Sequence, residues 1–287
     1  MEKKILHVLE GREKQITDTE VVRQSLPTAQ FRFANPFIVV HHMMPKFFPA
    51  GSPEDRLHPH PHRGFAPVTF MLQGQGFHRD NAGNAMTVSA GDVQWMFAGK
   101  GILHSEGPSE EFLQEGGVYE LLQLWFNVPA AHKFEAPYYQ YVPGNTMPVV
   151  ANEAGVHLTL IGGEYGGQTG PLKNFTPITA IWGSIHAEKE FRLHAKPGYW
   201  TLLYLIDGCL LVNGTTVDCY HLVVFDKDDP HTEILLQATE TTRILYLSAE
   251  PINEPVAAKD NFVMNTAEEI EQAFSDYKNG LFGTLEK

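Results

Sequence analysis

Two short stretches of this chain decide the fold we expect and the chemistry we expect from it: His58-Pro59-His60-Pro61-His62-Arg63-Gly64-Phe65 and Gly101-Ile102-Leu103-His104-Ser105-Glu106. Successive side chains of a β-strand point to opposite faces, so residues two apart share a face. His60 and His62 therefore share one face of a strand, and so do His104 and Glu106. If these two strands lie side by side, three imidazoles and one carboxylate meet. This set predicts a metal site.

A simpler interpretation exists, because a single His-x-His pair occurs often by chance. The histidines could be partly exposed and could cap a turn or pair with nearby acids. Three histidines with a glutamate in the matching strand phase favour metal ligands instead. His58 has the same phase but lies further out, and we expect it to contact the ligands from behind or to be solvated. His41, His42 and His78 could line the same pocket or lie at the surface, and we expect the surface for each of them.

The segments around the two stretches predict short β-strands. Residues 68–72, 86–89 and 93–97 are rich in strand-forming side chains, and glycine-containing turns follow or separate them. This spacing favours an antiparallel sandwich or barrel over alternating strands and helices. Proline has no N–H to donate, so the histidine segment should lie at the rim of a sheet.

The second half repeats the strand pattern at residues 178–182, 199–206, 209–212 and 222–225, but it has no His-x-His pair. The predicted fold class is all-β: two antiparallel β-barrels with a short C-terminal helix. We expect a metal-binding barrel over residues 1–135, a linker and start of the second half over 136–176, a metal-free barrel over 177–250, and a tail over 251–287. In this tail Thr266 and Glu269 have the spacing of a capping box, and the helix should pack back on the barrels.

The composition limits the class of protein. The 287 residues carry a formal net charge of −13, with 43% hydrophobic and 19% charged residues, which is typical of a globular chain. A strongly acidic chain does not suit the phosphate backbone, so we expect no direct nucleic-acid binding. Cys209 and Cys219 are the two cysteines, and reduced thiols suit a cytoplasmic protein. No signal sequence or membrane-length apolar run is visible, so we expect no membrane partner.

Three motifs resemble the pirin family of the cupin superfamily. They are residues 60–65, His-Pro-His-Arg-Gly-Phe; residues 91–106, Gly-Asp-Val-Gln-Trp-Met-x-Ala-Gly-x-Gly-Ile-Leu-His-Ser-Glu; and residues 122–129, Leu-Gln-Leu-Trp-x-Asn-x-Pro. The resemblance extends over most of the chain, including residues 22–25, 35–37 and 262–274. It implies a monomeric bicupin, with two jelly-roll barrels of the double-stranded β-helix type. One divalent metal, usually iron as Fe(2+), would lie in the first barrel, and the matching positions are His60, His62, His104 and Glu106.

The ligand set alone does not select the metal, since nickel, manganese, copper or zinc could take the same ligands. A structural zinc site is disfavoured, because such sites are usually rich in cysteine and neither cysteine lies near the motifs.

Some pirin-like proteins resemble quercetinases, which open the ring of a flavonol with O₂. By that resemblance the partners would be O₂ and a small aromatic substrate such as quercetin, and Glu106 would be the catalytic base. A large apolar wall would suit a planar ligand, and its candidates are Phe65, Phe70, Phe77, Trp95 and Trp125. The alternative function is that of a non-catalytic iron-dependent redox sensor or a regulatory binding protein, with another protein as its partner. The same four ligands would serve it, so whether the chain is an enzyme stays open.

The residue after Arg-Gly-Phe departs from the pirin pattern. Pirins often have glutamate after Arg-Gly-Phe, whereas this chain has Ala66. The missing acid could alter hydrogen bonding around the metal or the fit of a substrate.

Arg63 follows His62 directly, so it should point away from the metal face. We expect it to pair with an acid such as Asp80 or Asp92.

Overall fold

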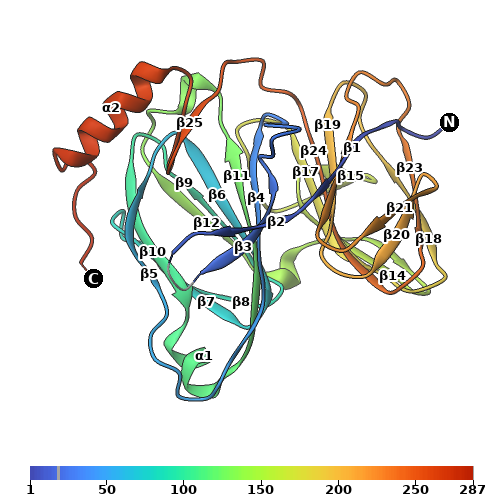
Figure 1. Ribbon diagram of the computed structural model, residues 1–287, viewed down its shortest axis with the longest axis horizontal. Helices are drawn as coiled ribbons and strands as arrows, with labels where there is room; N and C mark the ends of the chain where they lie inside the picture. Colours follow the sequence, from blue (N-terminus) through green and yellow to red (C-terminus); the bar gives the residue numbers. More distant parts are fainter. Residues whose placement is uncertain (18–19, 287) are drawn as a thin grey trace. The chain divides into compact units, whose positions relative to one another are not determined.

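The computed structural model describes residues 1–17 and 20–286, and the regular structure of these residues consists mainly of β-strands (Figure 1). The first strands are β1 (Ile5–Glu10), β2 (Arg12–Gln15), β3 (Val21–Leu26), β4 (Phe37–Phe48), β5 (Leu57–His62), β6 (Phe65–Gln73), β7 (Gln75–Asp80), β8 (Ala85–Ser89), β9 (Val93–Phe97), β10 (Ile102–Pro108), β11 (Gly117–Asn127), β12 (Tyr138–Val142) and β13 (Val149–Glu153). The later strands are β14 (Val156–Gly162), β15 (Glu164–Tyr165), β16 (Gln168–Thr169), β17 (Ile178–Ile185), β18 (Glu190–His194), β19 (Trp200–Leu205), β20 (Cys209–Val212), β21 (Thr215–Asp218), β22 (His221–Phe225), β23 (Glu233–Ala238), β24 (Thr242–Ala249), β25 (Ala257–Lys259) and β26 (Phe262–Met264).

Helices are few and short. They are α1 (Glu110–Glu115) and α2 (Ala267–Lys278), together with the 3-10 turns η1 (Ala130–His132) and η2 (Gly144–Thr146). Within the described residues, no helix has the length and apolar character needed to span a bilayer.

The chain folds into two compact units, and each unit contains segments that are distant in the sequence. Unit 1 comprises residues 1–36 and 145–251, and unit 2 comprises residues 37–144 and 252–287. Each unit is defined by the contacts that its residues make with one another. The boundaries predicted near residues 135, 177 and 250 divide the chain by sequence position instead, and they stay predictions.

Unit 2 contains both histidine motifs in a pair of antiparallel sheets. Five of its strands lie in the order β12-β9-β6-β11-β4, and four more lie in the order β5-β10-β7-β8. Apolar side chains fill one end of this unit between strands and α1, namely Phe48, Met71, Val88, Phe112, Leu113, Tyr119 and Leu121. The antiparallel barrel predicted around the histidines is therefore confirmed.

Unit 1 is a second antiparallel assembly with an apolar interior. Its sheets have the orders β1-β22-β19-β24-β17-β14-β13 and β18-β23-β20-β21. The core between them consists of buried aliphatic and aromatic side chains, among them Leu158, Leu203, Leu236, Phe225 and Tyr246. Burial of this surface is the main favourable term in the stability of such a barrel. The repeated strand pattern in the second half of the sequence thus does correspond to a second barrel.

The C-terminal tail packs in unit 2, on the strands that carry the histidine motifs. Helix α2 begins at the capping box of Thr266 and Glu269, as predicted, and lies beside β25 and β26 (Figure 1, red). Its buried face joins Leu103 in a small apolar cluster with Phe262, Met264, Ile270, Ala273 and Phe282. Since Leu103 precedes His104 directly, the tail supports the strand that holds this histidine.

Arg63 attaches the first histidine motif to the tail. Its Nη1 donates to Asp276 on α2 at 2.7 Å, and its Nε donates to the carbonyl of Lys100 at 2.6 Å. The guanidinium also lies over the ring of Phe282. The prediction of an ion pair is confirmed, but the predicted partners were wrong. The acid comes from a helix 213 residues further along the chain, a separation that no local pattern reveals.

Lys133 ties three segments of unit 2 together from a buried position. Its ammonium donates to the carbonyl of Gly64, to Oδ1 of Asn127 and to the carbonyl of Val263, at 2.6, 2.6 and 2.9 Å. Burial lowers the pKa of Lys133 to about 7, although the carboxylates of Glu254 and Glu269 partly oppose this shift. Hence the hydrogen bonds of one amine hold the turn after His62 against the tail.

We expect stability to rise with pH more steeply in the wild type than in Lys133→Met, which lacks the contribution of this amine. Between pH 7 and 10 the unfolded chain still binds the lysine proton, whereas the folded chain has released it. Raising the pH therefore favours folding, by about 1 kcal/mol per pH unit from this group. Urea unfolding of both proteins at several pH values in this range measures the difference. Equal pH dependence in the two proteins would contradict the buried position of this amine.

Candidate metal centre

Strand β10 lies between β5 and β7, and this order positions the centre. Across β10 and β5, His104 lies directly opposite His60. Across β10 and β7, the same His104 lies opposite Asp80. The pairing with β5 is antiparallel and brings the His60–His62 pair alongside the strand that carries His104 and Glu106, as the sequence predicted.

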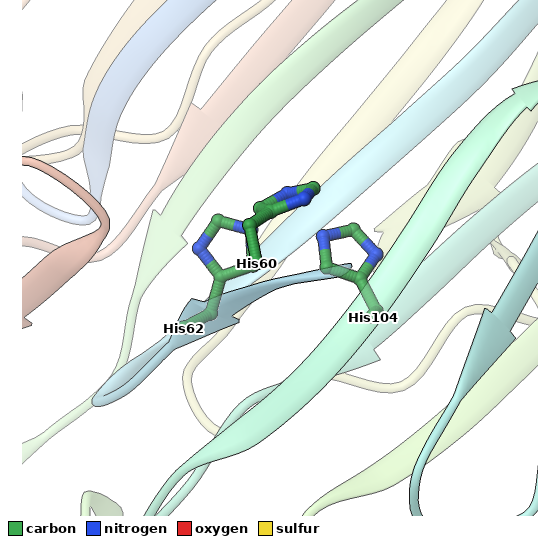
Figure 2. Close-up of side chains that lie close together, drawn as sticks. All are labelled: His60, His62 and His104. Atoms are coloured by element: carbon green, nitrogen blue, oxygen red, sulfur yellow. The ribbon is translucent and has the colours of Figure 1, made fainter. Parts of the chain in front are cut away.

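The three histidines of the two motifs converge. Figure 2 shows His60 and His62 on β5 and His104 on the neighbouring β10, with their rings gathered around a common point. The ring centroids are 5.0 Å apart for His60 and His62, 4.3 Å for His60 and His104, and 4.8 Å for His62 and His104. One nitrogen of each ring lies within 4.8 Å of the others. This spacing fits three nitrogen ligands of one ion.

Hydrogen bonds leave one nitrogen of each ring available. Nδ1 of His60 faces the carbonyl of His58 at 2.9 Å, and Nδ1 of His62 faces the carbonyl of Asn261 at 3.4 Å. A carbonyl only accepts, so each Nδ1 carries the proton and each Nε2 keeps a lone pair. Nε2 of His104 is buried and has no hydrogen-bond partner among the described residues.

The imidazoles of His62 and His104 are neutral at physiological pH, as metal ligands must be. Burial lowers the pKa of His62 well below its usual value, and the neighbouring His60 lowers it further. Burial has the same effect on the pKa of His104, again reinforced by His60. An unpartnered, buried, neutral imidazole nitrogen beside two others fits a metal ion and is otherwise costly to bury.

Glu106 shares the barrel interior but belongs to a second group. Its carboxylate oxygen lies within 4.8 Å of one nitrogen each of His78 and His104. Gln123 donates to Oε1 at 2.5 Å and Gln94 donates to Oε2 at 3.4 Å, so an amide orients each oxygen. The structure thus places Glu106 next to the three-histidine group through His104, which the two groups share.

Several polar side chains of this interior lie outside the motifs that predicted the site. His78 is buried, stacks on the ring of Tyr139 with centroids 4.8 Å apart, and lies 3.1 Å from Asp80. The expectation that His41, His42 and His78 lie at the surface was wrong, because all three are buried. The available signal was spacing: His78 and Asp80 are two apart on a strand, as His60 and His62 are.

The predicted aromatic wall divides between two faces. Phe65 and Trp125 lie against His62, with ring centroids 5.2 and 5.9 Å from it, and contact each other at 4.5 Å. Thr69 and Gln94 form a hydrogen bond with each other and so lie on the same face of the sheet. Phe70 and Trp95 are their next neighbours along the two strands, so both rings point to the opposite face. Phe77 likewise alternates with His78 and lies under the guanidinium of Arg56.

Strand alternation also settles where the side chain at position 66 points. Phe65 faces His62, so the next residue on β6 faces the opposite side of the sheet. Ala66 is fully buried there. A glutamate at this position would point away from the histidines, so alanine removes no acid from their surroundings.

Comparisons with known proteins agree with this geometry. The family model described as pirin matches residues 18–126, and the pirin C-terminal cupin domain matches residues 182–283. A putative quercetin 2,3-dioxygenase of Pseudomonas aeruginosa is 37% identical over 251 residues, 86% of each chain. Pirin-1 of Arabidopsis thaliana is 34% identical over 267 residues, 92% of this chain and 88% of its own.

The fold matches as well. A crystal structure of quercetin 2,3-dioxygenase from Acinetobacter baumannii superposes with a TM-score of 0.94 at 33% identity, covering all of both chains. The two barrels are therefore of the cupin type, with a short helix at the C-terminus, as predicted. The motifs, the two matched family models and the relatives together show that this chain belongs to the pirin family.

Proposed function

We propose that this protein is a metal-dependent dioxygenase that opens flavonol-type substrates. One divalent ion, iron as Fe(2+), would be held by Nε2 of His60, His62 and His104, with the carboxylate of Glu106 on or beside it. The observation that carries the proposal is the buried Nε2 of His104, which lies beside two other imidazoles and has no hydrogen-bond partner in the described part of the chain. Such a mixed imidazole and carboxylate set is typical of iron oxygenases.

The names of the relatives support the choice of reaction. Both the Pseudomonas relative and the Acinetobacter structure are described as quercetin 2,3-dioxygenases, the former as putative. The reaction consumes one O₂ per flavonol and releases one molecule of carbon monoxide with the ring-opened ester. Bound iron would act as a Lewis acid toward the deprotonated substrate and would exchange electrons with O₂.

The surrounding side chains supply binding and proton transfer. Glu106 would take the proton of the flavonol 3-hydroxyl at a carboxylate oxygen, while Gln123 and Gln94 hold the carboxylate in place. Phe65 and Trp125 would form the apolar wall for the aromatic rings, because they lie against His62. The indole Nε1 of Trp125 is buried and has no hydrogen-bond partner in residues 1–17 and 20–286, so it offers a donor to a substrate oxygen.

Metal binding is the first testable step. We expect the wild type to bind one equivalent of Fe(2+) or Co(2+) under anaerobic conditions. His104→Ala should weaken this affinity by about 100-fold or more, since even the loss of groups outside the ligand set costs about 10- to 100-fold. His132→Ala is the control, because His132 is only half-buried and pairs with Glu135. Chelator competition measures all three proteins, and equal affinities for wild type and His104→Ala would contradict the site.

Turnover is the second step. Iron-loaded wild type should consume quercetin and O₂ in equal amounts and release carbon monoxide. Glu106→Gln should lower the rate by about 100-fold or more, the usual contribution of a general base, and by a larger factor than it lowers metal affinity. Flavonol absorbance and headspace carbon monoxide give the readout. Stoichiometric iron without any turnover of flavonols would refute the dioxygenase proposal and favour the redox-sensor alternative.

A further inference from the structure

We propose that Asp80 and His78 are positioning residues, which together fix the tautomer of His104 so that its Nε2 offers a lone pair to the metal. The inference rests on the proposed metal site. It assigns a role to two residues that lie outside both sequence motifs, on β7 rather than on β5 or β10.

The contacts form a continuous chain from the hairpin after β7 to the three-histidine group. Nδ1 of His104 lies 3.4 Å from Nδ1 of His78. Nε2 of His78 lies 3.1 Å from Oδ2 of Asp80. All three side chains are buried, with 1%, 1% and 5% of their surface exposed. Water therefore competes little for these hydrogen bonds.

Only one arrangement of protons satisfies this chain with neutral rings. A carboxylate can only accept, so Nε2 of His78 carries the proton it donates to Asp80. Nδ1 of a neutral His78 then has a lone pair and can only accept. The proton between the two rings must therefore lie on Nδ1 of His104. Nε2 of His104 is left with its lone pair, and this buried atom is the one for which the described residues offer no hydrogen-bond partner.

His104 needs such a chain, whereas His60 and His62 do not. Their Nδ1 atoms face backbone carbonyls, which cannot donate and so set the tautomer directly. The neighbour of His104 is instead an imidazole, which can donate or accept. Without Asp80, the pair of rings could reverse both protons, and Nε2–H of His104 would then point at the metal position. Asp80 removes this ambiguity by fixing the proton of His78, which in turn fixes the proton of His104.

The hairpin between β7 and β8 holds Asp80 rigidly. Its Oδ1 accepts from the backbone N–H groups of Ala82 and Asn84 at 2.9 and 3.0 Å. The side-chain amide of Asn84 donates to both carboxylate oxygens. Tyr139 stacks on His78 and fixes the plane of its ring. Oδ1 thus accepts hydrogen bonds from the hairpin, and Oδ2 is the oxygen that faces His78.

The variant Asp80→Asn tests the inference. The backbone donors of Ala82 and Asn84 should hold the new amide oxygen in the place of Oδ1, so the NH₂ group would face His78. His78 would then accept at Nε2 and donate from Nδ1, which shifts the proton of His104 to Nε2. In ¹⁵N-histidine-labelled, metal-free protein, long-range ¹H–¹⁵N spectra should show the Nδ1–H tautomer of His104 in the wild type and the Nε2–H tautomer in Asp80→Asn.

Metal affinity gives the second readout. Asp80→Asn should bind Co(2+) about 10- to 100-fold more weakly than the wild type, the usual cost of losing a partner of a metal-bound histidine. Glu120→Gln is the matched control, because Glu120 is a buried carboxylate 3.1 Å from Nε2 of His42 in the same unit. This control should lose folding stability but keep the affinity of the wild type.

Variants at position 78 keep the test decisive if Asp80→Asn folds poorly. His78→Gln retains one acceptor and one donor and should keep much of the metal affinity. His78→Phe retains only the stacking on Tyr139, and its metal affinity should fall by about 10- to 100-fold.

An unchanged His104 tautomer, or unchanged metal affinity in both Asp80→Asn and His78→Phe, would overturn the inference. Loss of all binding in His78→Gln would also overturn it, since His78 would then be a ligand. A wild type without metal affinity would instead refute the proposed function, while the tautomer spectra would still be measurable.

Discussion

The antiparallel pairing of β10 with β5 on one side and β7 on the other is the constraint on which the centre depends. It brings His104 opposite His60 and, across the other edge, opposite Asp80. A shift of one residue in either pairing would turn the side chains of that strand to the other face. Convergence of the imidazoles is therefore a property of sheet register, and everything that stabilises this register also stabilises the site.

The C-terminal tail is one such stabilising element, although it contributes no side chain to the group of histidines. The carbonyl of Asn261 faces Nδ1 of His62, and the backbone N–H of Val263 donates to the carbonyl of Arg63. Gly64 must lack a side chain there, because a Cβ would lie 2.2 Å from the carbonyl oxygen of Val263 and its φ is +83°. The tail and the first histidine motif thus pack too closely to move independently.

The sequence was sufficient for those parts of the site that follow from local alternation. The shared face of His60 and His62, and the phase of His104 and Glu106, needed only the period of a strand. The partners of Arg63 and Lys133 could not be predicted, because Asp276 and Val263 join them from more than 100 residues away. The role of His78 was missed although its spacing to Asp80 was visible, since burial depends on which sheet face the barrel encloses.

X-ray absorption at the metal edge of the iron-loaded protein counts the ligands of the ion themselves. We expect three imidazole ligands, recognisable by multiple scattering from their rings, together with oxygen ligands and no sulfur. One imidazole or none, or a sulfur ligand, would show that the ion binds away from His60, His62 and His104.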